Sequence, residues 1–299
     1  MVGSAVLSTV LVLSGCAAAK TPETPERTDI AYGHDSAAQV LDLYRPADTD
    51  WPVPLVIYIH GGGWSAGDKS AINDARMTAM TSFKNDLLDA GYAVAAINYR
   101  LTPEAIWPAQ IFDVKGAVRY LSANAKKYGL DPRRFAAFGD SAGGHLVGLL
   151  TTTGGLQPME GTVGGTDGSS AIKVGISYFG PFNLPTMQPE AAAQCGDGVG
   201  EVGQSALIGG PITTPPYSDA AALASPVTHV DASDAPLLLL HGTTDCVVAY
   251  AQSDEMHAKL EAAGVPTALI SRDVGHSDPI FFTDDEIVDQ VLAFISEHL

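Results

Sequence analysis

Basic residues are scarce in this sequence. Its 299 residues include 16 Lys and Arg against 34 Asp and Glu, which gives a formal net charge of −18. No run of basic residues is present, so a nucleic acid is not expected as a partner. An excess of negative charge mainly keeps a chain soluble and self-repelling, and it carries no information about the fold.

Long apolar runs are also missing. No internal stretch is long enough to cross a bilayer as a helix, and neither a repeat of about 20–50 residues nor a coiled-coil heptad is visible. Hydrophobic residues nevertheless make up 46% of the chain, which is enough for a sizeable core. The length allows one large α/β domain or two small ones.

Cysteine is rare as well, with only Cys16, Cys195 and Cys246 in the chain. Cys-x-x-Cys pairs and His/Cys clusters are absent from the sequence, so no metal site is expected. Cys195 and Cys246 are an even pair, which could form a disulfide in an oxidising compartment.

The N-terminus carries a short apolar segment, residues 5–13, which has the length of a signal peptide and is too short to span a membrane. The segment ends in Leu13-Ser14-Gly15-Cys16, which resembles a bacterial lipobox. Residues 1–16 are therefore expected to be a signal peptide whose Cys16 is lipidated. No Lys or Arg precedes the segment, and an ordinary cleaved secretory signal is the alternative. Either predicts export, as a protein attached to a bacterial membrane through its N-terminal lipid only or as a secreted protein. Residues 17–27 then form a disordered tether, and residues 28–299 the folded domain.

From Leu55 onward, short apolar runs alternate with amphipathic stretches. The pattern predicts strands at residues 28–32, 39–44, 55–60, 92–97, 134–138, 172–178, 237–240 and 268–271. It predicts helices at residues 83–90, 108–128, 145–150, 253–263 and 284–299. This order indicates an α/β fold, with a mostly parallel sheet, helices on both faces and the first hairpin added at one edge. Ligands of such sheets bind at the carboxyl ends of the strands.

The chemistry is expected to start at Ser141. Gly139-Asp140-Ser141-Ala142-Gly143 fits G-x-S-x-G between an apolar strand and a helix, which is the context of a nucleophile elbow. The glycines allow neighbouring backbone to pass close to a strained serine. Ser141 would then lie at a carboxyl strand end, over a helix N-terminus that favours an anion.

A serine hydroxyl needs a base, and His276 is the best of eight histidines. It follows the last predicted strand, in a loop at the carboxyl edge, and the chain order Ser, acid, His is the order used on this kind of fold. His241 ends its own strand and is interpreted as packing. His145, just after the nucleophile, is expected to support the elbow.

The acid that orients the base is predicted to be Asp245, which follows a strand and precedes His276 by 31 residues. Asp231, Asp234 and Asp273 are rivals, but the first two precede the strand and would lie at the wrong end of the sheet. Asp140 is expected to point away from the base.

The loop His60-Gly61-Gly62-Gly63-Trp64 follows the first buried strand and has the form of an oxyanion motif. The backbone N–H groups of Gly62, Gly63 and Ala142 are the predicted donors to the oxyanion. His60, Gly61 and Trp64 are expected to support them, with His60 bracing the loop.

These segments together resemble the α/β-hydrolase superfamily, from about Ala31 to Leu299, and in particular its hormone-sensitive-lipase-like and BD-FAE-like (bifunctional feruloyl and acetylxylan esterase) carboxylesterases. The matching segments are residues 41–46, 60–64, 98–101, 139–144, 225–226, 241–245 and 275–276. The resemblance implies an eight-stranded-type sheet and a cofactor-free serine hydrolase that cleaves carboxylic esters through an acyl-enzyme.

The resemblance leaves the ester itself open. A feruloyl or acetylxylan esterase acting on plant polysaccharide esters, a peptidase of the same fold and a non-catalytic binding protein are the alternatives. About fifty residues precede the first buried strand, too few for the propeller of prolyl peptidases. Residues 188–216 depart from the family pattern, and a small cap insertion is predicted at residues 182–226.

Cys195 lies in this insertion, and Cys246 directly follows the predicted acid. A disulfide between them would tie the cap to the acid loop, and two buried free thiols are the alternative.

Overall fold

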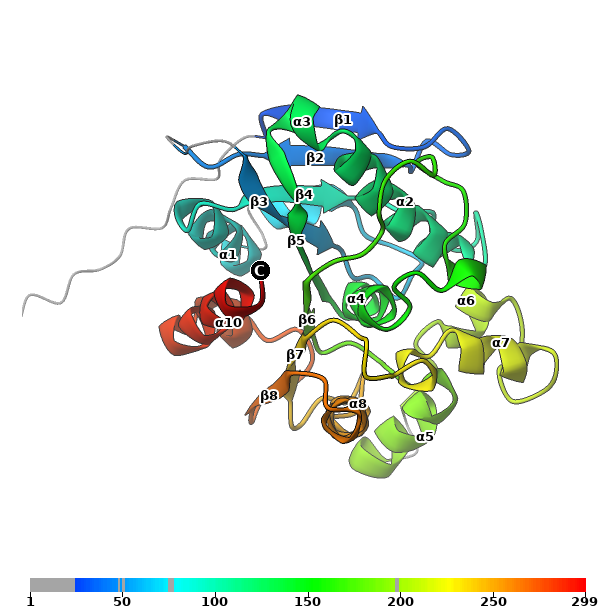
Figure 1. Ribbon diagram of the computed structural model, residues 1–299. Helices are drawn as coiled ribbons and strands as arrows, with labels where there is room; N and C mark the ends of the chain where they lie inside the picture. Colours follow the sequence, from blue (N-terminus) through cyan, green and yellow to red (C-terminus); the bar gives the residue numbers. More distant parts are fainter. Residues whose placement is uncertain (1–24, 48, 50–51, 75–77, 197–198) are drawn as a thin grey trace, which may run out of the picture.

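The computed structural model describes residues 25–47, 49, 52–74, 78–196 and 199–299 (Figure 1). The predicted signal peptide, Cys16 and residues 17–24 of the predicted tether lie outside the described residues. A single sheet of eight strands has the order β1-β2-β4-β3-β5-β6-β7-β8. The strands are β1 (Arg27–Ala31), β2 (Val40–Tyr44), β3 (Val53–Ile59), β4 (Ala93–Ile97), β5 (Leu130–Asp140), β6 (Val174–Tyr178), β7 (Leu237–Gly242) and β8 (Thr267–Arg272).

The sheet is parallel from β4 to β8, and β1 and β2 form an antiparallel hairpin at the β4 edge. The prediction of a mostly parallel sheet with an added hairpin is confirmed. The central strands β3, β4 and β6 are buried along nearly their whole length because helices cover both faces of the sheet (Figure 1).

Ten helices and three short 3₁₀ turns lie among the described residues. They are α1 (Thr78–Asp89), α2 (Ala109–Ala123), α3 (Ala125–Tyr128), α4 (Ala142–Thr152), α5 (Leu184–Cys195), α6 (Gln204–Ile208), α7 (Tyr217–Leu223), α8 (Ala251–Ala263), α9 (Ile280–Thr283), α10 (Asp285–His298), η1 (Lys69–Asn73), η2 (Gln157–Met159) and η3 (Pro226–Thr228). Helices α2, α4 and α8 bury their apolar residues in the core on one face of the sheet. Helices α1, α9 and α10 do so on the other face. None of the helices in the described part of the chain combines the length and the apolar character that crossing a membrane requires.

Helix α1 begins at Thr78 rather than at residue 83, and the helix after β4 and strand β5 also differ from the prediction. The single helix expected over residues 108–128 is interrupted at Asn124, and Gly129 ends the second piece in the left-handed conformation at φ 62°. Strand β5 begins at Leu130 rather than at Arg134, because Leu130 pairs with Val53 across an irregularity in the β3–β5 ladder.

The predicted cap region, residues 182–226, follows β6 and contains α5, α6 and α7. Helix α5 packs against α7 and α8. The region therefore follows the carboxyl end of a central strand, which is the edge where the predicted site residues lie.

Candidate active site

Ser141 lies on the sharp turn between β5 and α4, with φ 52° and ψ −117°. A positive φ is unfavourable for a residue with a side chain, and such strain persists only where the surrounding structure fixes it. The Ser141 N–H donates to the carbonyl of Tyr178 at 2.9 Å. A Cβ atom on Gly143 would lie 2.0 Å from the Ile59 carbonyl oxygen, so glycine is required for α4 to approach the end of β3.

His276 reaches Ser141 from the loop that follows β8. The Ser141 hydroxyl lies 3.0 Å from His276 Nε2, and His276 Nδ1 lies 2.6 Å from Asp245 Oδ2. Because a carboxylate only accepts hydrogen bonds, Nδ1 carries the proton and Nε2 is free to accept the proton of the serine. The ring of Phe179 packs edge-on against the His276 imidazole, with 4.9 Å between the ring centroids. The arrangement can activate a hydroxyl as a nucleophile.

Asp245 is fully buried at the turn after β7. Its Oδ1 accepts hydrogen bonds from the N–H groups of Val247 and Val248, at 2.8 and 2.9 Å. Burial alone would raise the pKa of the Asp245 carboxyl, but hydrogen bonds from His241 and His276 hold that pKa well below its ordinary value. Asp245 is therefore ionised wherever the fold is intact at neutral pH.

His241 does more than the packing that the sequence suggested. Its Nε2 lies 2.9 Å from the Val248 carbonyl and 3.3 Å from Asp245 Oδ2, and because both oxygens only accept, Nε2 carries the proton. Its Nδ1 then accepts from the Ser253 hydroxyl at 2.6 Å. Asp245 Oδ2 is therefore contacted by two imidazoles, those of His276 and His241. Its spacing of four residues before Asp245 was a signal of this contact that the strand pattern concealed.

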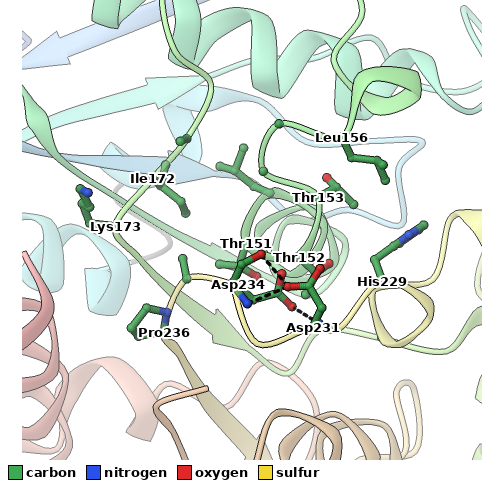
Figure 2. Close-up of a pocket in the computed structure, with 16 residues that line it drawn as sticks. Thr151, Thr152, Thr153, Leu156, Ile172, Lys173, His229, Asp231, Asp234 and Pro236 are labelled. Carbon is green, nitrogen blue, oxygen red and sulfur yellow. Dashed lines mark hydrogen bonds between the residues drawn. The ribbon is translucent and has the colours of Figure 1, made fainter. Parts of the chain in front are cut away.

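The rival acids lie elsewhere. Asp273 is exposed, and Asp231 and Asp234 lie at the amino end of β7, beside a cavity of about 670 Å³ (Figure 2). There the Asp231 N–H donates to Asp234 Oδ2 at 2.9 Å. Figure 2 shows this cavity between the C-terminal end of α4 and the segments that enter β6 and β7. It is therefore remote from Ser141.

The predicted oxyanion loop, His60 to Trp64, follows β3 and is called the oxyanion loop below. Gly62, Gly63 and Trp64 have φ values of 109°, 58° and 58°. No residue in the described ranges accepts a hydrogen bond from the N–H groups of Gly62, Gly63 or Ala142. These three donors are consequently available to a ligand.

His60 braces this loop from within. Its Nδ1–H donates to the Gly61 carbonyl at 2.8 Å. Its ring stacks on the ring of Tyr99, with 4.4 Å between the ring centroids. The Tyr99 hydroxyl donates to the His60 carbonyl at 2.9 Å. Burial lowers the pKa of His60, so the ring is neutral.

Trp64 is held by His145 on α4. The indole N–H donates to His145 Nδ1 at 3.2 Å, and His145 Nε2–H donates to the Ala224 carbonyl at 2.7 Å. Burial lowers the pKa of His145 to about 4. A neutral histidine therefore links the elbow helix, the oxyanion loop and the end of α7.

The insertion contacts both functional loops. A disulfide joins Cys195 to Cys246, with an S–S distance of 1.99 Å and a Cα–Cα distance of 5.7 Å. The Gln194 amide donates to the Asp245 carbonyl at 2.6 Å. A Cβ atom on Gly203 would lie 2.9 Å from the Gly63 carbonyl oxygen, so the segment before α6 lies against the oxyanion loop.

Groups of three or more His, Cys, Asp or Glu side chains that could bind a metal ion are absent from the described residues.

Comparisons with known proteins identify the family of the chain and its fold. A family model described as BD-FAE matches residues 41–260, a range that includes Ser141 and Asp245 and ends before His276. The chain is 31% identical over 232 residues to the probable carboxylic ester hydrolase LipM of Mycobacterium tuberculosis, covering 75% of this chain and 49% of the relative. It is 30% identical over 251 residues to esterase LipC of the same organism, covering 83% of this chain and 58% of the relative. The chain thus spans about half the length of the curated relatives it matches.

Among solved structures, a truncated form of a carbohydrate esterase from gut microbiota is similar over 93% of this chain and 97% of its own. The two share a TM-score of 0.79 and 31% identity.

Proposed function

This chain belongs to the BD-FAE family and has the α/β-hydrolase fold, and from these premises we propose that it hydrolyses carboxylic esters with Ser141, His276 and Asp245 as a catalytic triad. The observation that carries the proposal is the continuous chain of hydrogen bonds from Ser141 Oγ through His276 to Asp245. The names of the relatives support the ester as the bond that is cleaved.

In the acylation half, Ser141 Oγ attacks the ester carbonyl carbon while His276 Nε2 takes the serine proton. Asp245 stabilises the imidazolium that forms. The N–H groups of Gly62, Gly63 and Ala142 would donate to the oxyanion of the tetrahedral intermediate. The intermediate collapses when the C–O bond to the alcohol breaks and His276 protonates the leaving oxygen.

In the deacylation half, His276 takes a proton from water, and the resulting hydroxide attacks the acyl-enzyme. The second intermediate collapses to release the acid, and His276 returns the proton to Ser141 Oγ. No redox or metal cofactor enters either half of the reaction.

A carbohydrate ester is a second, narrower candidate substrate, favoured by the similarity to a protein named as a carbohydrate esterase. This reading corresponds to a feruloyl or acetylxylan esterase. Release of acetate from acetylated xylan, or of ferulate from a feruloyl sugar ester, at a kcat/KM above that for p-nitrophenyl acetate would support it. Activity on p-nitrophenyl esters alone would contradict it.

We also propose that the protein works outside the cytoplasm. The disulfide between Cys195 and Cys246 supports an oxidising compartment. Lipidation at Cys16 is the finer form of this proposal, and mass spectrometry of the membrane fraction of the native host would detect it.

Turnover of p-nitrophenyl acetate by the Ser141→Ala variant tests the proposed function. We expect a loss of several orders of magnitude in kcat, because the acyl-enzyme cannot form. Ser233→Ala, at an exposed serine by the remote cavity, is the matched control and should leave kcat unchanged. A Ser141→Ala variant with a tenth of the wild-type kcat would refute the assignment.

A further inference from the structure

Asp140, the residue before the nucleophile, contacts the oxyanion loop. It ends β5, and its Oδ1 accepts hydrogen bonds from the Tyr58 hydroxyl at 3.0 Å and from the Gly61 N–H at 3.2 Å. Tyr58 belongs to β3, the strand that leads into the loop. One carboxylate oxygen therefore connects the nucleophile elbow, the strand before the loop and the loop itself.

Asp140 and Gly61 are so close together that no side chain fits at position 61. A Cβ atom on Gly61 would lie 2.5 Å from Asp140 Oδ2 and 2.8 Å from the Asp140 carbonyl oxygen. Any side chain at position 61 would displace one of the two segments. Gly61 immediately precedes Gly62 and Gly63, so a displacement of Gly61 moves the two proposed donors that follow it.

We propose that Asp140 is a positioning residue for the oxyanion loop, which fixes the Gly62 and Gly63 N–H groups relative to Ser141. The proposal rests on the proposed ester hydrolysis. A preorganised donor that is displaced contributes less in the transition state than in its fixed position, and one such donor is worth about 10²–10³ in kcat. Asp140 touches no reacting atom in this account.

The oxygen atom of Asp140 matters here more than its charge. A negative charge close to a developing oxyanion opposes that oxyanion, so the benefit of Asp140 must come from the hydrogen bonds that Oδ1 accepts. Both Tyr58 and Gly61 donate to Oδ1, and Asp140 borders a cavity of about 260 Å³ beside Phe179 and Ser277. An asparagine can therefore keep the accepting oxygen and place its NH₂ group on the Oδ2 side.

Steady-state kinetics of Asp140→Ala and Asp140→Asn on p-nitrophenyl acetate test this. We expect Asp140→Ala to lower kcat by about 10- to 100-fold with KM changed less than threefold, and Asp140→Asn to restore kcat to within about fivefold of wild type. Asp131→Ala is the matched control. Asp131 lies near the start of the same strand, pairs with Arg133 and Arg134, and should leave kcat unchanged.

The inhibition constant of a compound that forms a tetrahedral adduct is a second measurement. It would not change if Asp140 only stabilised the fold. An alkyl trifluoromethyl ketone forms an adduct on the serine whose oxyanion needs the same donors. Its Ki should rise in Asp140→Ala by the same factor as kcat/KM falls, and should stay near the wild-type value in Asp140→Asn. Thermal melting of each variant checks that it is folded.

The inference is overturned if Asp140→Ala keeps kcat within twofold, if Asp140→Asn is as impaired as Asp140→Ala, or if the Ki of the ketone is unchanged. Should Asp140→Ala fail to fold, Tyr58→Phe replaces it, because that change removes one of the two donors to Oδ1. We expect a two- to tenfold loss in its kcat, and no loss would overturn the inference.

Failure of the proposed function and failure of the positioning role give different results. Wild-type protein that does not hydrolyse esters would refute the proposed function. An inactive Ser141→Ala variant beside a fully active Asp140→Ala variant would refute the positioning role alone.

Discussion

At the scale of single residues, Asp245, the proposed acid, has more partners than a triad requires. Asp245 accepts two backbone N–H groups and faces two imidazoles, all from segments near its own turn or the next strand. Such a carboxylate is held in one orientation. It can therefore fix the tautomer of His276 and stabilise the cation that forms during proton transfer.

We predict that Asp245→Asn lowers kcat for p-nitrophenyl acetate by about 10³- to 10⁴-fold, because an amide no longer enforces the correct tautomer of His276. Asp273→Asn is the matched control, since Asp273 is exposed in the loop that carries His276. A silent Asp245→Asn together with a damaging Asp273→Asn would mean that Asp273 is the acid.

His145 links protonation to stability. Its pKa is about 4 in the folded protein and about 6.5 when unfolded, so between these values the unfolded state binds the extra proton. The contribution of neutral His145 to the free energy of unfolding is fully present above about pH 6.5. As the pH drops from about 6.5 to about 4, the free energy of unfolding should fall by about 3 kcal/mol because this contribution is lost.

Urea unfolding of wild type and His145→Leu at pH 7 and pH 4 measures this contribution. When the pH is lowered from 7 to 4, we expect the unfolding free energy of the wild type to fall by about 3 kcal/mol more than that of His145→Leu. Asp234, whose pKa burial raises to about 6, contributes with the opposite sign but equally in both proteins. A difference that does not change with pH would contradict a neutral, buried His145.

At the scale of elements, the ends of the strands explain why much of the site could be predicted. Ser141, Asp245 and His276 each follow an apolar run that the sequence marks as a strand, and parallel strands bring such ends to one edge. The break of the helix at Asn124 had no such signal. Asn124 ends α2, and its side-chain amide donates to the Tyr120 carbonyl at 2.9 Å, a local hydrogen bond that competes with the helix and that apolar periodicity does not reveal.

The contacts of Asp140 and His241 were not predicted, for a related reason. Asp140 was correctly expected to point away from the base, but the partner it meets depends on the close approach of the Gly61 backbone. His241 reaches Asp245 because the chain turns tightly after β7. Both contacts depend on side-chain directions at turns, which strand and helix periodicity does not specify.

The disulfide connects α5 to the acid loop across a sequence separation of 51 residues. A closed loop of this length restricts the unfolded chain by about 4 kcal/mol in a chain-entropy estimate. We predict that dithiothreitol lowers the melting temperature of the wild type and loosens the region around Asp245 first. Hydrogen exchange with mass spectrometry would show this as faster exchange of Val247 and Val248, whose N–H groups bind Asp245.

The Cys195→Ser, Cys246→Ser double variant is the control for the effect of the reductant. Its melting temperature should lie below that of the oxidised wild type and should not respond to dithiothreitol. A wild-type melting temperature that is equally insensitive to the reductant would contradict a stabilising bridge.

At the scale of the whole molecule, two cores cover opposite faces of one sheet, and the candidate site lies at the carboxyl ends of its strands. The proposed nucleophile comes from the end of β5, the proposed base from the loop after β8 and the proposed acid from the turn after β7. The proposed oxyanion donors come from the loop after β3 and from α4. The cap region adds a disulfide and a backbone contact to two of these loops. The large cavity at the other end of the sheet contributes nothing to this chemistry.

The central claim is that Ser141 is the nucleophile, and labelling with a fluorophosphonate tests it most directly. Peptide mass spectrometry of the labelled wild type should find one adduct per chain, on Ser141, with loss of ester hydrolysis in proportion to labelling. The His276→Ala variant should label far more slowly, because the serine proton has no acceptor. An adduct on another residue, or full ester hydrolysis by protein whose Ser141 is modified, would contradict the account.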